Sequence, residues 1–390
     1  MIIPRLALRN LLGARIRTWL NVAVLSLSFV AIIIFQGIFR GLDEQGSKFK
    51  IESEYGGGQY WQQDYDAFDP LTLQDAHAKV PEALERLIQG GQAAAILVVQ
   101  GTLYPNGRVM PVLIKGIDPG QKILTLPSSF LALNSANVPA LIGSRMAKSS
   151  GLRIGDTITL RWRETGGSFN ALDLEITQVM NTTNPGIDNG QVWLPLEKLR
   201  SMTRMEGEAN LVVLAKGVNE FPRVPGWTYK DLDTLLKDLK SMVKAKSVGG
   251  TILYTFLLLL AMLAIFDTQV LSIFKRRKEI GTLMALGMTR GAVVRLFTLE
   301  GALHGVLAAL VGAAYGMPLA VFLMKKGWAL PQGTDSYGFA LGNNLFPAYS
   351  AGLVIGTTVL VLTVTTIVSY LPTRKISKLK PTDALRGRIS

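Results

Sequence analysis

Four long apolar segments divide the chain and separate polar stretches of very different length. The segments are residues 19–40, 250–274, 297–324 and 348–371. Each is long enough to cross a hydrocarbon layer of roughly 30 Å as an α-helix. The first is longer than the apolar core of a signal peptide, and no small-x-small cleavage site follows it. The pattern therefore predicts four transmembrane α-helices, of which the first is an uncleaved anchor.

Residues 41–249, between the first two apolar segments, have the mixed pattern of a large folded domain. Pro105-Asn106-Gly107 and Gly166-Gly167 each lie between two apolar, β-branched runs, which is typical of a β-hairpin. We expect strands at 94–104, 108–118, 156–162, 169–180, 191–194 and 209–215. Helices are expected at 141–150 and 195–205, and over 71–89, where Pro81 breaks the helix into two pieces and Gly90-Gly91 ends it. Short strands with few helices indicate an α+β fold.

The end of this domain has a different pattern. Leucine and valine recur at helical spacing between residues 230 and 246, at Leu232, Leu235, Leu236, Leu239 and Val243. If the helix continues into the second apolar segment, it has about 46 residues and a length of about 69 Å. Such a helix would be a rigid stalk between the domain and the membrane. The alternative is a surface helix that stops at Gly249-Gly250.

Composition and charge support a membrane protein and set its orientation. The chain is 48% hydrophobic and 18% charged, with a net charge of +13 and a mean hydropathy of +0.29. Sixteen Lys and Arg residues lie in segments 1–18, 275–299 and 372–390, beside the apolar segments. This distribution argues against a soluble nucleic-acid-binding protein. By the positive-inside rule, both termini and the loop 275–296 are cytoplasmic, whereas 41–249 and the loop 325–347 lie outside.

The sequence offers no set of residues for catalysis or metal binding. There is no cysteine to complete a metal site, and the two histidines, His77 and His304, lie in different parts of the predicted topology. Asp267 is the one acid well inside an apolar segment, so no pair of carboxylates can form within one chain. Asp267, Glu300 and His304 are the intramembrane polar candidates. Asp267 has either a functional or a packing role, and Glu300 and His304 can pair at i, i+4.

Residues 41–48 resemble a phosphate-binding loop, but the residues stand in the wrong order and follow a membrane segment. We interpret this stretch as a polar connector rather than as a nucleotide site. Glycines at four-residue spacing, in contrast, indicate close helix packing in the third and fourth apolar segments. These glycines pack either within the chain or against a second subunit. They are Gly301, Gly305, Gly312, Gly316, Gly352 and Gly356.

The loop after the second apolar segment reads RRKEIGTLMALGMTRGAVVRLFTLEG, from Arg276 to Gly301. It resembles the motif of FtsX-like ABC transporter permeases, the superfamily of the lipoprotein-releasing (LolC/LolE) and MacB permeases. Segments 5–20, 142–160 and 370–386 resemble other parts of the same family. The matching loop residues are Arg276, Arg277, Glu279, Ile280, Gly281, Leu283, Ala285, Leu286, Gly287, Thr289, Glu300 and Gly301.

The resemblance implies four spans, a MacB-type periplasmic domain at 41–249, an interfacial helix at 1–18 and a basic cytoplasmic tail at 372–390. It also implies a coupling helix within 275–296 that docks in a groove of a cytoplasmic ATPase. Gly287 would end this helix and Thr289 would cap the next. The alternative is a helix that lies on anionic lipid. The expected coupling residues are Arg277, Glu279, Ile280, Leu283, Met284, Leu286, Gly287, Thr289 and Arg290.

The family implies a non-catalytic permease subunit of the bacterial inner membrane. Its expected partners are two ATPase subunits, which bind ATP and Mg, a second permease copy or homologue, membrane lipid and an extracytoplasmic substrate; we expect no nucleic acid and no cofactor on this chain. We expect lipoprotein release, because MacB permeases usually carry an ATPase on the same chain and none is found in this sequence. The alternatives are regulation of a cell-wall hydrolase and MacB-like efflux of a small molecule or peptide. A membrane scaffold that needs no ATP is a further alternative.

Overall fold

The computed structural model describes residues 7, 15–67, 69, 72–73, 75–133, 137–180, 185–329 and 344–374. These residues form two compact units. One consists of Met1–Leu42, Val243–Trp328 and Leu345–Ser390, and the other of Asp43–Met242 and Ala329–Asn344, in each case as far as they are described. The predicted interfacial helix 1–18, the loop 325–347 and the tail 372–390 lie largely outside the described residues.

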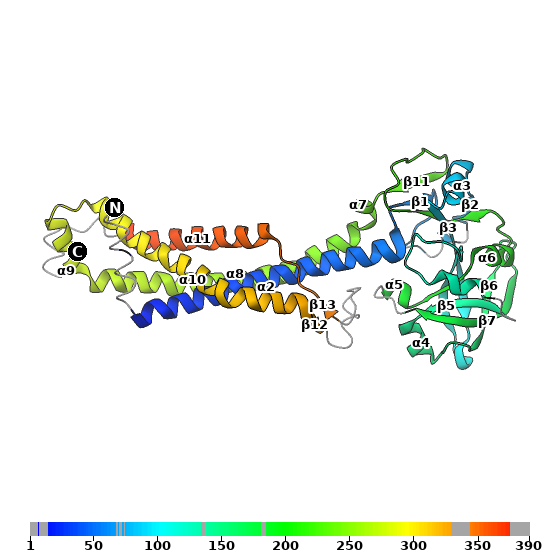
Figure 1. Ribbon diagram of the computed structural model, residues 1–390, viewed down its shortest axis with the longest axis horizontal. Coiled ribbons are helices and arrows are strands. Elements are labelled where there is room, and N and C mark those ends of the chain that lie inside the picture. The colour runs from blue at the N-terminus through cyan, green and yellow to red at the C-terminus, as the bar shows by residue number, and fades with distance from the viewer. Residues whose placement is uncertain are drawn as a thin grey trace. The chain divides into compact units, whose positions relative to one another are not determined.

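The first unit is a bundle of four long helices with one short helix. The helices are α2 (Arg15–Lys50), α8 (Lys237–Lys275), α9 (Arg277–Ala285), α10 (Arg290–Lys326) and α11 (Ala351–Thr373) (Figure 1). In the described chain, α2, α8, α10 and α11 are the four helices long and apolar enough to cross a membrane. They meet around a shared apolar cluster that includes Phe29 of α2, Ile265 of α8, Ala308 of α10 and Val361 of α11. The predicted four transmembrane helices are thus confirmed.

Two of these helices are longer than the apolar pattern predicts. Helix α2 continues to Lys50, so the polar connector expected at 41–48 is helical. Helix α8 passes through Gly249-Gly250 without interruption, so the alternative of a helix that stops at the glycine pair is wrong. It begins at Lys237 rather than at Tyr229, after the short helix α7 (Leu232–Leu235). Four of the five residues of the predicted stripe are buried, since Leu235, Leu236, Leu239 and Val243 are each less than 10% exposed, and Leu232 is half-buried.

The second unit is the α+β domain, built on a nine-stranded sheet of order β11-β1-β10-β3-β4-β8-β5-β7-β6. Strand β3 also pairs with β6, which closes six of the strands into a ring. The strands of this sheet are β1 (Gln59–Gln62), β3 (Ala93–Leu103), β4 (Met110–Ile117), β5 (Val138–Gly143), β6 (Thr157–Arg163), β7 (Phe169–Met180), β8 (Gln191–Pro195), β10 (Leu211–Leu214) and β11 (Trp227–Lys230). Two short pairs are β2 (Ala78–Lys79) with β9 (Glu208–Ala209), and β12 (Trp328–Ala329) with β13 (Asn344–Leu345).

Apolar clusters lie on both faces of the nine-stranded sheet. Successive side chains of β3 point to opposite faces, so the strand contributes to both clusters. Leu97 and Val99 belong to one cluster, and Ile96 and Val98 to the other. The helices of this domain are short. They are the π-helical turn η1 (Ile51–Tyr55), α3 (Glu82–Gln89), η3 (Pro105–Gly107), η4 (Ser128–Ala132), α4 (Ser144–Ser150), α5 (Pro185–Asp188) and α6 (Leu196–Thr203).

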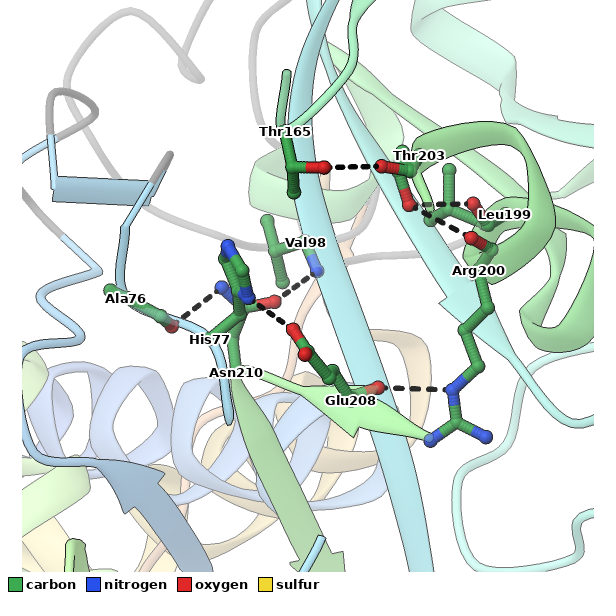
Figure 2. Close-up of polar contacts among 9 residues, drawn as sticks. All are labelled: Ala76, His77, Val98, Thr165, Leu199, Arg200, Thr203, Glu208 and Asn210. Carbon is green, nitrogen blue, oxygen red and sulfur yellow. Dashed lines mark hydrogen bonds and ion pairs between the residues drawn. The ribbon is translucent and has the colours of Figure 1, made fainter. Parts of the chain in front are cut away.

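Hydrogen bonds of buried polar groups complete the sheet where β10 begins beside β3, as Figure 2 shows. The amide of Asn210 accepts a hydrogen bond from the backbone N–H of Val98 at 2.6 Å and donates one to the carbonyl of Ala76 at 2.8 Å. Arg200 of α6 donates to the carbonyl of Glu208 at 3.0 Å. One fully buried asparagine thus continues the backbone pairing beyond the end of the strand.

The two predicted hairpins, β3–β4 and β6–β7, are confirmed. The first turns at Asn106 and Gly107, which have φ values of +51° and +78°, and such values favour these two residue types. The predicted break at Pro81 is confirmed, since α3 begins directly after it and ends before Gly90, but the piece before Pro81 is not one helix, because β2 occupies residues 78–79. The helix expected at 141–150 begins only at Ser144, since the preceding residues form β5.

Candidate functional site

The turn between α8 and α9 is organised by one side chain, Arg276. Its guanidinium donates two hydrogen bonds of 2.7 Å to the carboxylate of Glu279, and one of 3.1 Å to that of Glu300 on α10. It also lies 5.0 Å from the ring centroid of Phe297. The Arg276 side chain is 20% exposed, and that of Glu300 is 7% exposed. Arg276 therefore joins the end of α8, the first turn of α9 and the first turns of α10.

A small apolar cluster holds α9 against the same helices. Ile280 is fully buried with Ile273 of α8 and with Val293 and Phe297 of α10, and Met284 packs against this group. The sequence predicts that Ile280 and Met284 belong to a face that docks on an ATPase. For Ile280 this prediction is wrong, and Met284 is half-buried, because both face the bundle. Leu286, in contrast, is 79% exposed.

Both ends of the linker between α9 and α10 match the expected local structure. Gly287 has a φ of +97°, in the region that favours glycine, and its N–H donates to the carbonyl of Met284 at 3.1 Å. Thr289 is the N-cap of α10, and its hydroxyl accepts a hydrogen bond from the N–H of Ala292 at 3.3 Å. The predictions that Gly287 ends the helix and that Thr289 caps the next are confirmed.

The loop that contains α9 and the start of α10 also carries charged groups. The hydrogen bonds from Arg276 hold the pKa of Glu279 below its usual value, and Glu279 lies in the first turn of α9, where a carboxylate is favourable. The guanidinium of Arg277 lies 4.0 Å from the ring centroid of Phe274. Arg290 is exposed at the first position of α10, and Leu283 is half-buried. The exposed charged residues of this loop are therefore mainly basic, with Leu286 as a large exposed apolar side chain.

The three intramembrane polar candidates do not form one group. The Nδ1 atom of His304 lies 2.9 Å from the backbone oxygen of Glu300, not from its carboxylate, so the predicted i, i+4 side-chain pair is wrong. Arg276 binds that carboxylate instead. Asp267 is exposed on α8 and makes no hydrogen bond or ion pair with the described part of the chain.

The comparisons with known proteins agree with this architecture. Residues 251–381 match the family FtsX-like permease C-terminal, and residues 18–222 match the family MacB-like periplasmic core domain. The second match alone covers more than half of the chain. The chain belongs to the FtsX-like ABC transporter permeases. Its large α+β domain is the extracytoplasmic domain of such a permease, between the first and second membrane helices.

The permease is similar to proteins of two named systems. The lipoprotein-releasing system transmembrane protein LolC of Xylella fastidiosa is 22% identical over 330 residues, which cover 75% of this chain and 77% of that protein. The macrolide export ATP-binding/permease protein MacB of Neisseria gonorrhoeae is 26% identical over 187 residues, which cover 47% of this chain and 27% of that protein. Among solved structures, the extracellular domain of the ABC-type transporter YknZ from Gram-positive bacteria is 16% identical. The structural match covers 42% of this chain and 84% of that domain, with a TM-score of 0.27.

The predicted packing glycines of the permease divide into two classes. A Cβ at Gly301 would overlap the side chain of Ser369 on α11, and one at Gly305 would lie 3.2 Å from Leu362 and Thr365 on the same helix. Gly312 and Gly316 face Phe29 and Val30 of α2, at 2.9 and 2.7 Å from the added Cβ. These four glycines therefore pack within the chain. Gly352 and Gly356 are exposed, and no neighbouring helix of the described chain lies within 4 Å of a Cβ added at either.

Sequence reasoning missed Arg276 as a site residue, although it is part of the matched motif. The available signal was its i, i+3 spacing to Glu279 directly after an apolar segment. It also missed Ser369 and Gln269, which approach Gly301. Nothing in the local sequence marks these two residues, because they come from other helices.

The rest of the permease shows no second chemical centre within the described residues. No group of three or more metal-ligating side chains is found there. His77 of the extracytoplasmic domain pairs with Glu208 on β9, as Figure 2 shows, and this pair holds β2 and β9 together. Residues 41–48, which resemble a phosphate-binding loop, lie inside α2.

Proposed function

We propose that this permease carries ATP-driven movement from a cytoplasmic ATPase to its extracytoplasmic domain, and that the work performed there is the release of lipoproteins from the outer leaflet of the inner membrane. The observation that carries the proposal is the contact of Arg276 with Glu279 and Glu300. This contact fixes the short helix α9 to two membrane helices, so that a force on α9 acts on the bundle.

The exposed part of α9 is suited to docking on a separate protein. Leu286 is exposed at its C-terminal end beside Gly287, and the same loop carries exposed cations such as Lys278 and Arg290. A large apolar anchor residue with charged residues at the rim of the contact is common where a helix docks in a groove of its partner. In this proposal, Leu286 and the half-buried Leu283 contact the ATPase, whereas Ile280 fixes α9 to the permease.

The route from α9 towards the extracytoplasmic domain is a continuous helix. Helix α8 has 39 residues without interruption, which corresponds to a length of about 58 Å. An unbroken helix of this kind transmits axial movement better than a loop does, because bending is concentrated at kinks. The proposed orientation places α9 and both termini in the cytoplasm, following the basic segments that flank the membrane helices.

The proposed complex contains two ATPase subunits, which bind ATP and Mg, and a second permease, either identical or homologous. Closing of the two ATPase subunits on ATP would bring the two copies of α9 together. The ensuing shift of the extracytoplasmic domains would then act on the substrate without a pore through the membrane.

The choice of lipoprotein release rests on the extent of the matches. The LolC protein is matched over about three quarters of both chains. The MacB protein is matched over 27% of its own length. MacB-like efflux is the second candidate, since residues 18–222 match the MacB-like periplasmic core domain.

The docking step is tested with Leu286→Asp in the full chain, coexpressed with a candidate ABC ATPase subunit from the same genome. Because Leu286 is 79% exposed, a charge there leaves the bundle intact but weakens docking, so we expect loss of ATPase copurification and of stimulated ATP hydrolysis. Val109→Asp is the matched control, since Val109 is 68% exposed in the extracytoplasmic domain. Copurification of the Leu286→Asp variant at the wild-type level would refute the assignment.

The cargo is tested separately, with the wild-type complex in proteoliposomes. ATP-dependent release of a triacylated lipoprotein supports the first candidate. ATP-dependent release of a macrolide or peptide, without release of the lipoprotein, would instead support MacB-like efflux. If neither is released and the complex captures a cell-wall hydrolase, the permease is a regulator of that hydrolase.

A further inference from the structure

Strand β4 of the extracytoplasmic domain carries a lysine in an apolar environment. Lys115 is 7% exposed and stands in register with Trp193 of β8. Its ammonium lies 5.2 Å from the ring centroid of Trp193, within the apolar cluster on that face of the sheet. Burial lowers the pKa of Lys115. A buried ammonium is costly unless it is well paired and hydrogen-bonded.

The groups around Lys115 do not fully satisfy it. The nearest carboxylate oxygen, Oε1 of Glu54, is 3.9 Å from Nζ, which is too long for a hydrogen bond. On the adjacent strand, Nε1 of Trp193 and Oε1 of Gln191 are buried and have no hydrogen-bonding partner in the described structure. Buried polar atoms of this kind are few in folded proteins, and several in one place indicate a site retained for a reason other than stability.

The carboxylate belongs to the segment that follows α2 in sequence and is hydrogen-bonded to the sheet. Glu54 lies in η1, a π-helical turn that directly follows α2. Hydrogen bonds join the backbone around η1 to the domain, among them one from Gly57 N–H to the carbonyl of Leu214 at 2.7 Å and one from Thr125 N–H to that of Glu52 at 2.8 Å. π-helical turns are rare and often occur at functional sites.

We propose that Lys115 and Glu54 are positioning residues through which displacement of α2 is passed to the strands of the extracytoplasmic domain. The proposal rests on the function proposed above and adds the point at which movement enters this domain. The attraction between the two charges rises steeply as their separation falls in a poorly solvated site. A shift of η1 towards β4 would therefore let the Glu54 carboxylate and the Lys115 ammonium form a hydrogen bond. A shift in the other direction would separate the two charges. The position of η1 is in this way coupled to β4 and β8.

The test uses the full chain reconstituted in nanodiscs with its ATPase, and compares hydrogen–deuterium exchange with and without ATP and vanadate. In the wild type we expect an ATP-dependent change both at residues 51–58 and in β4 and β8. In Lys115→Met we expect the change at 51–58 to remain and the change in the two strands to be lost. Lys198→Met, which replaces an exposed lysine of α6, should behave as the wild type.

Thermal unfolding of the same variants separates transmission from simple stabilisation. Met fills the space of Lys115 without a buried charge, so the melting temperature of the domain should be equal to or above that of the wild type. Glu54→Gln removes the carboxylate beside the buried ammonium and should lower the melting temperature. The double variant with Lys115→Met should regain the wild-type melting temperature.

Two results would overturn the proposal. One is a Lys115→Met variant whose strands still respond to ATP. The other is a lowered melting temperature of that variant, which would make Lys115 an ordinary structural residue. Failure of the wild type to show any ATP-dependent change would instead refute the function proposed above, so the two failures are distinguishable.

Discussion

Replacement of Arg276 by methionine tests the joint between α8, α9 and α10 directly. Methionine retains much of the length and apolar contact of arginine but removes all three hydrogen bonds to Glu279 and Glu300. The side chain of Glu279 is 51% exposed, so its loss of a partner costs about 0–1 kcal/mol. Glu300 is 7% exposed, and removal of one ion-pair partner from a buried charge costs up to about 3–5 kcal/mol. The second effect should therefore dominate.

A double-mutant cycle separates these contributions. Glu300→Gln removes the buried charge but leaves the hydrogen-bonding groups of Arg276 poorly matched, which costs about 1–3 kcal/mol. In the double variant no buried carboxylate has lost its ion pair with Arg276, so it should be more stable than Arg276→Met alone. The assay is reversible unfolding of the full chain in mild detergent, followed by intrinsic fluorescence, with Glu279→Gln as the exposed-partner control.

The result that refutes this reasoning is additivity. If the changes in the free energy of unfolding of the two single variants add up to that of the double variant, Arg276 and Glu300 do not interact energetically. Their contact could then not transmit force between the helices. An Arg276→Met variant as stable as the wild type would lead to the same conclusion. If instead the stability falls as expected but stimulated ATP hydrolysis is unchanged, the joint is structural and does not transmit force.

Two further predictions concern helix packing and pH. Gly301→Ala should destabilise the bundle by about 1–3 kcal/mol, because the added methyl group overlaps Ser369. Gly356→Ala, whose methyl group meets no neighbour in the described chain, should change stability by less than about 1 kcal/mol. Equal unfolding midpoints of the two variants in detergent would contradict this prediction. The depressed pKa of Glu279 means that its stabilising effect is complete above its unfolded pKa of about 4.3 and declines as the pH falls through the folded value. The difference in melting temperature between the wild type and Glu279→Gln should accordingly be constant near neutral pH and shrink below about pH 4, by an amount worth less than about 1 kcal/mol.

The membrane helices could be predicted from the sequence because an uncharged apolar run of about 20 residues is typical of a membrane span, but their ends could not. Hydropathy reports the thickness of the membrane, and α2 continues to Lys50 after its apolar residues end. Residues 41–50 contain no proline, and Gly46 lies where a Cβ would come within 3.3 Å of Leu239. The helix is therefore extended by packing against another segment, which a local pattern does not contain.

In the α+β domain, the hairpins could be predicted and the other strand pairs could not. Asn106 and Gly107 specify a turn by their own backbone preferences. Strand β5, in contrast, pairs with β7 in parallel and with β8. Its short apolar sequence runs directly into α4, so the local pattern of the combined segment indicates one helix. Strand β1 has the sequence QYWQ, which lacks the alternation expected of a strand.

At the site, the residues that act locally could be predicted and those that act across helices could not. Gly287 and Thr289 act on their own backbone and its neighbours, so their roles follow from residue type and position. A helical stripe does not reveal which partner covers it, and the stripe alone places Ile280 on the wrong surface. The local i, i+4 rule pairs Glu300 with His304, whereas its observed partner is 24 residues away in sequence.

The contacts along α10 differ in kind, and this difference indicates where movement is accommodated. Near α9, α10 is fixed by the ion pair of Glu300 and by the buried cluster around Phe297. Farther along, Gly312 and Gly316 bring α10 into van der Waals contact with Phe29 and Val30 of α2. An ion pair resists displacement because it is directional and costly to break, whereas smooth apolar surfaces can slide by an ångström or so at little cost. We therefore expect α9 and the adjoining ends of α8 and α10 to move as one body, with the shear between α10 and α2.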